Sequence, residues 1–425
     1  MIPRYDAIIV GGGVAGSTAA ILLAEAGWSV ALVEKKTFPR RKVCGECIAA
    51  PNIALLDALG VGSQFAELAG PPLERLGLYV GEDTLRADLP PFDGAGARWA
   101  RALGRERLDT LLIARAAGLG VAIRQPGAVD AIDRCGSLYV CRLSVDRREA
   151  ERIEAPLLIA AHGSWEPQPW DERRGKRARP GDLVAFKATF RGAALEPGLL
   201  PVLAFRGGYG GMVIAGDGVL TLACCIRRET LREWRAAVPA ASAGDAVQSG
   251  LAWCCKGVRL ALAGARREGA WLSVGPVRPG IRAHWSERSG FAVGNAAGEA
   301  HPILGEGISM AMQSSWLLCR RLANERDALL RGASQTGVAR AYAHDWRRSF
   351  AARVRWAAAL AQLAMRPQHA GVLLPLLRAA PSLLTVAARL GGKAKAFDEA
   401  TKQPRFEGAR TMVAAAVSRL GDQDV

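Results

Sequence analysis

The feature that most constrains the fold is a glycine pattern close to the N-terminus. Three glycines are spaced G-x-G-x-x-G, at Gly11, Gly13 and Gly16. An apolar, strand-like run at residues 7–10 precedes them, and residues 14–26 follow with the composition of a helix. Gly11 permits a tight turn, Gly13 lets a diphosphate approach the backbone, and Gly16 lets the helix pack closely on the strand. The pattern therefore predicts a dinucleotide-binding βαβ unit.

A second strand and an acidic residue complete this unit. Residues 29–33 are strand-like and are followed by Glu34, about twenty residues after the glycines. At that distance an acidic side chain is placed to bind the ribose of a dinucleotide. The amides of Val14 and Ala15 begin the helix and point at the expected diphosphate. We expect Lys35 to line the same site.

The order of the remaining segments predicts an α/β (α+β) fold. After a helix at residues 106–117, strand-like runs follow at 121–123, 139–145 and 157–161, which indicates a parallel sheet with an antiparallel annex. Short β-rich runs between residues 181 and 228 predict an antiparallel sheet in a separate lobe. The later segments are a strand at 289–294, a helix at 305–323 and a helical remainder at about 338–390.

Composition limits the partners and the compartment. Lysine and arginine number 56 against 40 acidic residues, so the formal charge is +16, which favours acidic partners. Nine cysteines without framework spacing indicate reduced thiols in the cytoplasm. The N-terminal apolar run ends in glycines, so we expect no secretory signal. The most apolar stretch, residues 371–392, is broken by prolines and arginines, so membrane contact would be peripheral at most.

Two further segments carry a family resemblance. Phe-Ala-Val-Gly-Asn-Ala-Ala-Gly at residues 291–298 leads through His301 and Pro302 to Gly-Glu-Gly-Ile at 305–308, and Leu-Leu-Ile-Ala-Ala-His-Gly-Ser stands at 157–164. With the first motif, this order resembles the p-hydroxybenzoate-hydroxylase-like flavoproteins and implies FAD as cofactor. The resemblance implies that the later segments contact the flavin through Gly294, Asn295, Pro302, Gly305, Glu306, Gly307 and Ile308. Asn295 and His162 stand where that superfamily usually has aspartates.

Within the superfamily, the chain resembles the geranylgeranyl-reductase-like and flavin-dependent-halogenase-like branch. Phe-Pro-Arg-Arg-Lys-Val-Cys-Gly-Glu at residues 38–46 looks like the loop that this branch places beside the flavin. The resemblance assigns Arg41, Cys44 and Gly45 to the cofactor site. It also assigns Arg105, four residues before Asp109, to the FAD phosphates.

The resemblance divides the chain into three regions. We expect a discontinuous, Rossmann-like FAD-binding domain with a parallel sheet at residues 1–73, 97–175 and 270–335. An inserted antiparallel-sheet substrate domain is expected at residues 74–96 and 176–269, and a helical C-terminal region at 336–425.

Several side chains are candidates for the chemistry. The backbone amides of the loop at 302–307 would face the flavin and stabilise its reduced form. Glu46 is either a polar group over the flavin ring or a loop carboxylate paired to Arg40 or Arg41. Cys44 is a flavin-lining thiol, an inert one, or a redox partner of Cys47. His301 and Pro302 either cover the flavin edge or staple the loop.

Three reactions are compatible with these residues. We place a hydroxylating monooxygenase first, because it needs few catalytic side chains once substrate is held and water is excluded. An ene-reductase of the geranylgeranyl-reductase type comes second, since residues 207–214 match its aromatic signature poorly. A halogenase comes third, because its signature in the same region is missing and Lys42, Lys176 and Lys187 lack a recognisable context.

The expected partners follow from these reactions. No second G-x-G-x-x-G follows a strand, so NAD(P)H would bind transiently or a separate flavin reductase would supply electrons. The substrate is expected to be a small aromatic molecule or a peptide-bound group, held in a cavity that Tyr209, Trp165 and Trp271 could line. The basic run at residues 173–179 is either a solvated linker or a site for an acidic or carrier protein. A non-catalytic basic flavoprotein is the remaining alternative, and nucleic acid is not expected.

Overall fold

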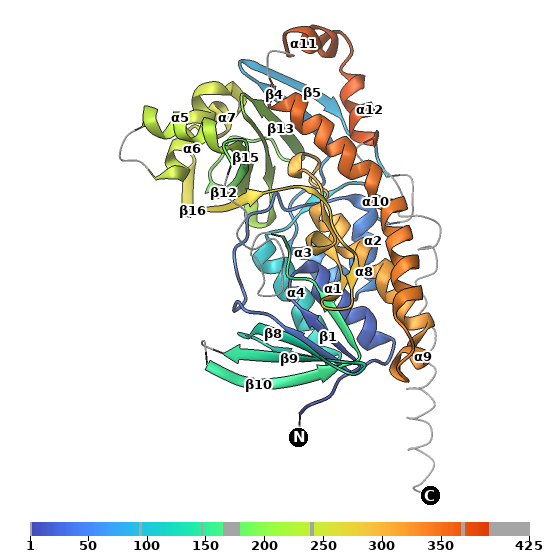
Figure 1. Cartoon of the computed structure of the whole chain (residues 1–425). Helices are drawn as coiled ribbons and strands as arrows, with labels where there is room; N and C mark the ends of the chain where they lie inside the picture. The colour runs from blue at the N-terminus through green and yellow to red at the C-terminus, as the bar shows by residue number, and fades with distance from the viewer. Residues whose placement is uncertain are drawn as a thin grey trace, which may run out of the picture.

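A parallel sheet in the lower half of the molecule and a second, larger sheet in its upper half define the architecture in Figure 1. The computed structural model describes residues 2–92, 96–145, 148–164, 179–238, 242–366 and 370–390. The α/β fold with one parallel sheet, antiparallel sheets and C-terminal helices confirms the predicted fold class.

The first sheet is parallel except at one edge. Its six strands lie in the order β18 (Trp285–Ser286), β19 (Gly290–Ala292), β11 (Leu157–Ala160), β1 (Ala7–Val10), β2 (Val30–Val33) and β7 (Ala122–Arg124). Only β18 runs antiparallel to its neighbour. Strand β1 has the predicted bounds and lies at the centre of this sheet.

Strand β1 is entirely apolar because both of its faces are covered. Ala7 and Ile9 pack in the large apolar cluster with helices α1 (Val14–Glu25) and α8 (Gly307–Asn324). Ile8 and Val10 pack on the other face, against the antiparallel annex. The annex strands are β8 (Ala128–Cys135), β9 (Leu138–Val145) and β10 (Arg148–Ala155). Successive side chains of a strand point to opposite faces, so a strand between two layers reads as a continuous apolar run.

The second sheet has seven strands. They lie in the order β16 (Arg266–Val277), β12 (Leu183–Arg191), β15 (Leu220–Arg227), β14 (Gly208–Ile214), β13 (Leu199–Phe205), β4 (Arg75–Val80) and β5 (Asp83–Asp88). All neighbours are antiparallel except β13 and β4. Strand β16 runs across residues 269 and 270, where the sequence analysis sets a domain boundary.

Short helices cover one face of this second sheet. They are α5 (Arg228–Ala237), α6 (Ala243–Cys254) and α7 (Lys256–Ala261). Val247, Leu251 and Val258 join the buried side chains of the sheet in one apolar cluster. These helices appear beside β12, β15 and β16 in Figure 1.

The remaining elements connect the two sheets. Two-stranded pairs join β3 (Cys47–Ile48) to β6 (Arg101–Ala102) and β17 (Gly280–Ile281) to β20 (Gly298–Glu299). The other helices are α2 (Ala50–Ala58), α3 (Gly62–Leu68), α4 (Arg105–Gly118), α9 (Arg326–Leu330), α10 (Thr336–Ala364), α11 (Ala370–Ala379) and α12 (Ser382–Leu390). Short 3-10 turns lie at η1 (Gly216–Gly218), η2 (Gly294–Ala296) and η3 (Pro302–Leu304).

Helix α10 is anchored along much of its length. Tyr342, Trp346 and Phe350 are fully buried against the first sheet and α8, and the far end of the helix approaches β13 and β14. In the described ranges, no helix combines the length and apolar character needed to cross a bilayer.

Candidate flavin-binding site

The turn between β1 and α1 cannot accept side chains at two positions. Gly11 has φ 108°, and a Cβ atom there would lie 2.6 Å from the carbonyl oxygen of Ala161, just after β11. A Cβ atom on Gly16 would lie 1.8 Å from the carbonyl oxygen of Gly11. Both contacts are far below van der Waals distance, so close packing of strand, turn and helix requires glycine here.

Gly13 has a different role from the other two glycines. It is the N-cap of α1, with φ −73°, a conformation open to any residue. A Cβ atom there would lie 3.6 Å from a guanidinium nitrogen of Arg105 and 3.7 Å from one of Arg40. The bare backbone therefore faces two cations across a space that a side chain would fill. A helix N-terminus opposite two guanidinium groups fits a diphosphate, so the residues present fit FAD.

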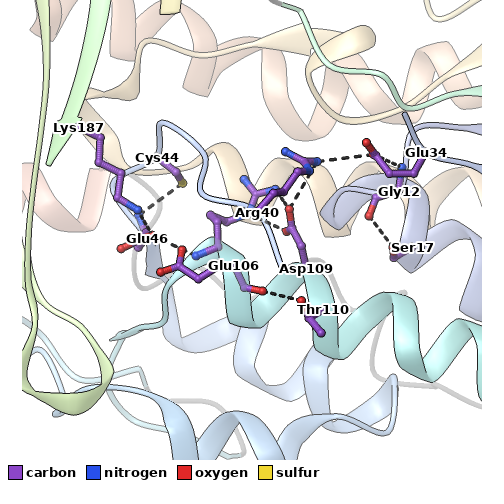
Figure 2. Close-up of polar contacts among 11 residues, drawn as sticks. Gly12, Ser17, Glu34, Arg40, Cys44, Glu46, Glu106, Asp109, Thr110 and Lys187 are labelled. Atoms are coloured by element: carbon purple, nitrogen blue, oxygen red, sulfur yellow. Dashed lines mark hydrogen bonds and ion pairs between the residues drawn. The ribbon is translucent and has the colours of Figure 1, made fainter. Parts of the chain in front are cut away.

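Buried charges hold these guanidinium groups in place (Figure 2). Arg105 donates two 2.8 Å hydrogen bonds to Asp109, one helical turn later in α4. Arg40 lies 3.7 Å from Asp109 and 3.6 Å from Glu34, and so bridges the two carboxylates. Arg40 is a candidate phosphate ligand that the sequence analysis did not assign.

Arg41, which was assigned to the cofactor, points elsewhere. Its guanidinium donates to Thr189 Oγ1 at 3.2 Å and to the carbonyl oxygen of Ala270 at 3.4 Å. Both acceptors belong to the seven-stranded sheet. Arg40 and Arg41 thus point toward different sheets, and Arg40 is the arginine of this loop that lies beside the glycine turn.

Glu34 lies at the end of β2, as predicted for a ribose ligand. One carboxylate oxygen accepts the amide of Gly12 at 2.9 Å, and the other accepts the amide of Lys36 at 2.8 Å. These bonds fix the carboxylate beside the glycine turn. Lys35 lies next to it, and burial, followed by the charge of Lys36, lowers the pKa of Lys35.

Lys42 should make the affinity of the candidate phosphate site for FAD depend on pH. Burial, together with the nearby charges of Arg105 and Arg40, lowers the pKa of Lys42 to about 8. Above that pH the ligand-free protein has lost this charge, and binding an anion would require uptake of a proton. We expect FAD affinity to fall between pH 8 and pH 10, by up to about tenfold per pH unit. Titration of the FAD-free protein measures the effect.

A Lys42→Met variant is the control for this pH dependence. It should bind FAD more weakly than the wild type at pH 7, and its affinity should change little between pH 8 and pH 10. An equally steep fall in the variant would show that another group titrates.

Glu46 forms the most constrained contact in the site. It has φ 61°, which non-glycine residues seldom adopt, and is 2% exposed. Its carboxylate accepts hydrogen bonds from the amide of Arg105 at 3.0 Å, from Thr221 Oγ1 at 2.6 Å and from the buried ammonium of Lys187. The predicted partners Arg40 and Arg41 are therefore replaced by Lys187 of β12 and Thr221 of β15.

The network around Glu46 joins the flavin-side loop to the second sheet (Figure 2). Lys187 has no exposed surface, and both oxygens of Glu46 are occupied. The arrangement is a buried clamp between two parts of the fold, and it leaves Glu46 no free oxygen to act as a general acid or base.

Cys44 and Gly45 lie in the same loop as Glu46. Cys44 is half-buried, and its sulfur accepts the amide of Glu46 at 3.4 Å. Cys47 is buried in β3, and neither thiol forms a disulfide. A Cβ atom on Gly45 would meet nothing within 4 Å, so the backbone there borders open space.

The segment at residues 291–298 packs directly on the glycine turn near the N-terminus. Gly294 has φ 58°, and a Cβ atom there would lie 2.8 Å from Cβ of Ala15 in α1. The amide of Gly294 donates to Ser314 Oγ at 2.9 Å, and Ser315 Oγ donates to the carbonyl oxygen of Ala15 at 2.8 Å. Segments 280 residues apart in sequence thus meet at the start of α1.

The Asn295 side chain points at Glu299. Its amide nitrogen donates to Glu299 at 3.2 Å, and its backbone carbonyl accepts from Arg282 at 2.8 Å. His162, the other residue that replaces a usual aspartate, follows β11. A Cβ atom added to Gly11 would lie 2.9 Å from the Cα atom of His162.

The loop after His301 opens α8, two residues later than the sequence predicts. Pro302–Leu304 forms a 3-10 turn, and Gly305 has φ 67°, so α8 begins only at Gly307. Glu306, the N-cap residue, is buried and lies 3.6 Å from Arg353 of α10. The N-terminal amides of an 18-residue helix therefore follow this turn, as an anion-stabilising edge requires.

A polar pair and a cavity lie next to this loop. The Nδ1 atom of His301 is 3.0 Å from the hydroxyl oxygen of Tyr209, a residue of β14. Tyr209 belongs to a small apolar cluster that also contains Val43 and Ile303, one from each loop of the candidate site. A cavity of about 130 Å³ borders the cluster and is lined in part by His301 and Met365.

The other predicted cavity residues lie elsewhere. Trp271 packs edge-on to Phe186 and Phe190, and its indole nitrogen donates to Gln248 of α6 at 3.3 Å. Trp165 and residues 173–178 fall outside the described residues, as do Lys176 and residues 391–425. In the part of the chain that the structure describes, no cluster of His, Cys, Asp or Glu is arranged to hold a metal ion.

Comparisons with known proteins agree with this geometry. Residues 4–173 match the model of the FAD binding domain family. Conditioned medium factor receptor 1 of Dictyostelium discoideum is 26% identical over 76% of this chain and 64% of its own length. Menaquinone reductase of Mycobacterium tuberculosis is 29% identical over 38% of each chain. The chain thus spans less than two thirds of these relatives.

Solved structures share the fold over almost the whole chain. The flavin-dependent brominase Bmp2 aligns with a TM-score of 0.71 over 99% of this chain and 100% of its own, at 18% identity. The myxobacterial chondrochloren halogenase CndH aligns with a TM-score of 0.69 over 82% and 80%, at 20% identity. PqsL of Pseudomonas aeruginosa, a probable FAD-dependent monooxygenase, aligns with a TM-score of 0.66 over 87% and 99%, at 20% identity.

The glycine turn, the family match and the shared fold all point to a flavin-binding protein. Residues 4–173 are similar to the FAD binding domain family, and the residues of the glycine turn fit its cofactor. The fold is shared with flavin-dependent halogenases, with a geranylgeranyl bacteriochlorophyll reductase-like protein and with PqsL, a probable FAD-dependent monooxygenase.

Proposed function

We propose that the protein is an FAD-dependent monooxygenase that hydroxylates an electron-rich aromatic compound, free or peptide-bound. In this reaction one atom of O₂ enters the substrate and the other leaves as water. Two electrons come from NAD(P)H or from flavin reduced by a separate reductase. The substrate would lie between the flavin and the seven-stranded sheet.

The apolar cluster around Tyr209 is the observation that carries this proposal. It contains Val43 and Ile303 from the two candidate flavin loops, together with Leu183, Cys225 and Met365. The pair of Tyr209 and His301 supplies its polar groups. Apolar side chains beside the cavity suit hydroxylation, in which the protein orients substrate and excludes water while the cofactor supplies the chemistry.

The size of the neighbouring cavity favours a single-ring substrate. Its volume is about 130 Å³, and a cavity of about 150 Å³ holds one benzene molecule. A second ring or a peptide would have to extend out of the cavity, which Arg227 and Gln362 also line.

Of the three candidate lysines, the two that the structure describes, Lys42 and Lys187, argue against halogenation. That reaction needs a lysine beside the flavin ring to capture hypohalous acid. Lys187 is fully buried and bound to Glu46, and Lys42 lies beside Arg105 and Arg40 at the candidate phosphate end. The similarity to the chlorinase of Pseudomonas fluorescens covers 37% of the chain at 28% identity.

A reductase is the second candidate. The similarity to menaquinone reductase favours it, as does Cys44, a half-buried thiol in the loop that this branch places beside the flavin. Such an enzyme would transfer hydrogen to an isoprenoid double bond without consuming oxygen.

A turnover assay separates these reactions. The purified protein should be yellow, and NADH or NADPH oxidation should consume oxygen when an aromatic substrate is present. The product should then carry one added oxygen atom by mass spectrometry. Anaerobic oxidation of the reduced protein by a polyprenyl compound would support the reductase instead, and bromide-dependent products would support the halogenase. Either result would replace the monooxygenase assignment.

A further inference from the structure

His301 and Tyr209 form a polar pair between the apolar cluster around Tyr209 and a cavity that Asp182, Arg227 and Gln362 also line. Tyr209 is 1% exposed and lies opposite Cys225 across strands β14 and β15. His301 precedes the turn at Pro302 and reaches the cavity of about 130 Å³. Its Nδ1 atom is 3.0 Å from the Tyr209 hydroxyl, so the other ring nitrogen, Nε2, is left for a group inside the cavity.

Both members of the pair are neutral near pH 7. Burial raises the pKa of Tyr209 well above 10, and the charge of Glu299 acts in the same direction. Burial lowers the pKa of His301 to about 4. The other ionisable groups around the pair are Cys225, whose pKa burial raises to about 12, and Asp182 and Arg227 in the cavity wall.

The hydrogen bonds of a neutral pair have only two arrangements. Either the Tyr209 hydroxyl donates to Nδ1, which places the histidine proton on Nε2, or Nδ1–H donates to the Tyr209 oxygen. In the second arrangement the hydroxyl proton of Tyr209 would turn to the sulfur of Cys225, with which it also interacts. Sulfur is a weak acceptor and an imidazole nitrogen is a strong one, so the first arrangement is favoured.

We propose that Tyr209 is a positioning residue that holds His301 in the Nε2–H tautomer, so that His301 binds an acceptor oxygen of the substrate in this cavity. The substrate class is a single-ring aromatic compound with a phenolic, phenolate or carbonyl oxygen. This assignment rests on the proposed function, because it treats the cavity as part of the substrate site.

The arrangement also provides selectivity. A substrate that lacks the oxygen would leave the Nε2–H group buried without an acceptor, which costs binding free energy. Arg227 and Asp182 give the cavity wall opposite charges, and Arg227 also lies 3.5 Å from Glu229. The selectivity therefore rests on the Nε2–H donor and not on the charge of the wall. The Arg227 guanidinium also contacts Gln362 of α10 at 3.4 Å.

The first test determines the tautomer directly. The FAD-loaded protein is labelled with 15N-histidine, and His301 is identified among the five histidines by its loss in a His301→Gln variant. We expect Nε2 to carry the proton and the spectrum to stay unchanged down to about pH 5, since the pKa lies near 4. In Tyr209→Phe, the single tautomer should give way to a mixture. A wild-type His301 protonated at Nδ1 would overturn the assignment.

The second test uses phenol and toluene as probes, because they match in size and only phenol has an oxygen. Binding to the FAD-loaded protein is followed by the His301 resonances and by the flavin spectrum. The wild type should bind phenol about three- to tenfold more tightly than toluene, the effect of one hydrogen bond. This preference should disappear in Tyr209→Phe and His301→Phe. His301→Gln keeps a donor near the Nε2 position and should retain it.

The variants separate positioning from a structural role. Equal losses of phenol and toluene binding in His301→Phe, an undiminished preference in that variant, or a wild type without preference would each contradict the inference. The two His301 variants keep this test decisive if Tyr209→Phe fails to fold. Oxygen-dependent turnover is measured separately, so the hydroxylase proposal can fail while the tautomer and the phenol preference hold.

Discussion

A Gly13→Leu variant should fold normally and lose FAD. The N-cap conformation of Gly13 suits any residue, and the nearest atoms to an added Cβ are guanidinium nitrogens at ordinary van der Waals distances of 3.6 and 3.7 Å. The rest of the leucine side chain would occupy the space between the helix N-terminus and Arg105. We expect FAD affinity to fall by at least about 100-fold, which corresponds to about 2.7 kcal/mol.

Flavin absorbance after gel filtration, together with titration of the FAD-free protein, measures this loss. Gly118→Leu is the matched control, because Gly118 is the last residue of α4 and an added Cβ there meets nothing within 4 Å. The control should retain FAD. A yellow Gly13→Leu protein with wild-type affinity would place the diphosphate elsewhere.

A Lys187→Met variant should be strongly destabilised. The substitution leaves the carboxylate of Glu46 buried without its cation, in a residue already held at φ 61°. Removing one partner of a buried ion pair costs about 3–5 kcal/mol of unfolding free energy. Urea unfolding of the FAD-loaded protein, followed by circular dichroism, measures the change.

Two further variants interpret that result. Lys187→Met combined with Glu46→Gln removes both charges and should recover most of the lost stability. Lys256→Met replaces an exposed lysine of α7 and should change stability by less than about 0.5 kcal/mol. If Lys187→Met and Lys256→Met unfold at the same urea concentration, the ion pair between Glu46 and Lys187 does not contribute to the free energy of unfolding.

Local patterns in the sequence were sufficient for the elements around the glycine turn. Strand β1 was predicted with its observed bounds, because four consecutive apolar residues before a glycine are readable without tertiary information. The roles of Gly11 and Gly16 were also predictable, because the G-x-G-x-x-G spacing marks positions where the backbone comes too close to neighbouring atoms for a side chain. The parallel sheet followed from the order of these segments.

Contacts between distant segments could not be predicted in this way. Glu46 and Lys187 are 141 positions apart, and Tyr209 and His301 are 92 apart. Neither pair has a periodic or spaced signature, because the partner is fixed by how the second sheet packs on the loop. The exchange of Arg40 for Arg41 has the same origin, since the loop alone does not determine which arginine points at which sheet.

The start of α8 and the short helix α7 were missed for local reasons. Gly305 adopts a left-handed conformation that separates the Pro302 turn from the helix, and a glycine is compatible with either state. Helix α7 has only six residues, too few for a helical period to be recognised.

Helix α10 connects the two large sheets as one continuous helix. Trp346 and Phe350 anchor it beside α8, and Met365, just past its last turn, accepts the amide of Gly207 between β13 and β14 through its carbonyl oxygen at 3.0 Å. Swinging the second sheet away from the first would break one of these attachments. We therefore expect the two sheets to keep their spacing during turnover. Small molecules should then enter and leave past the C-terminal end of α10, at Gln362.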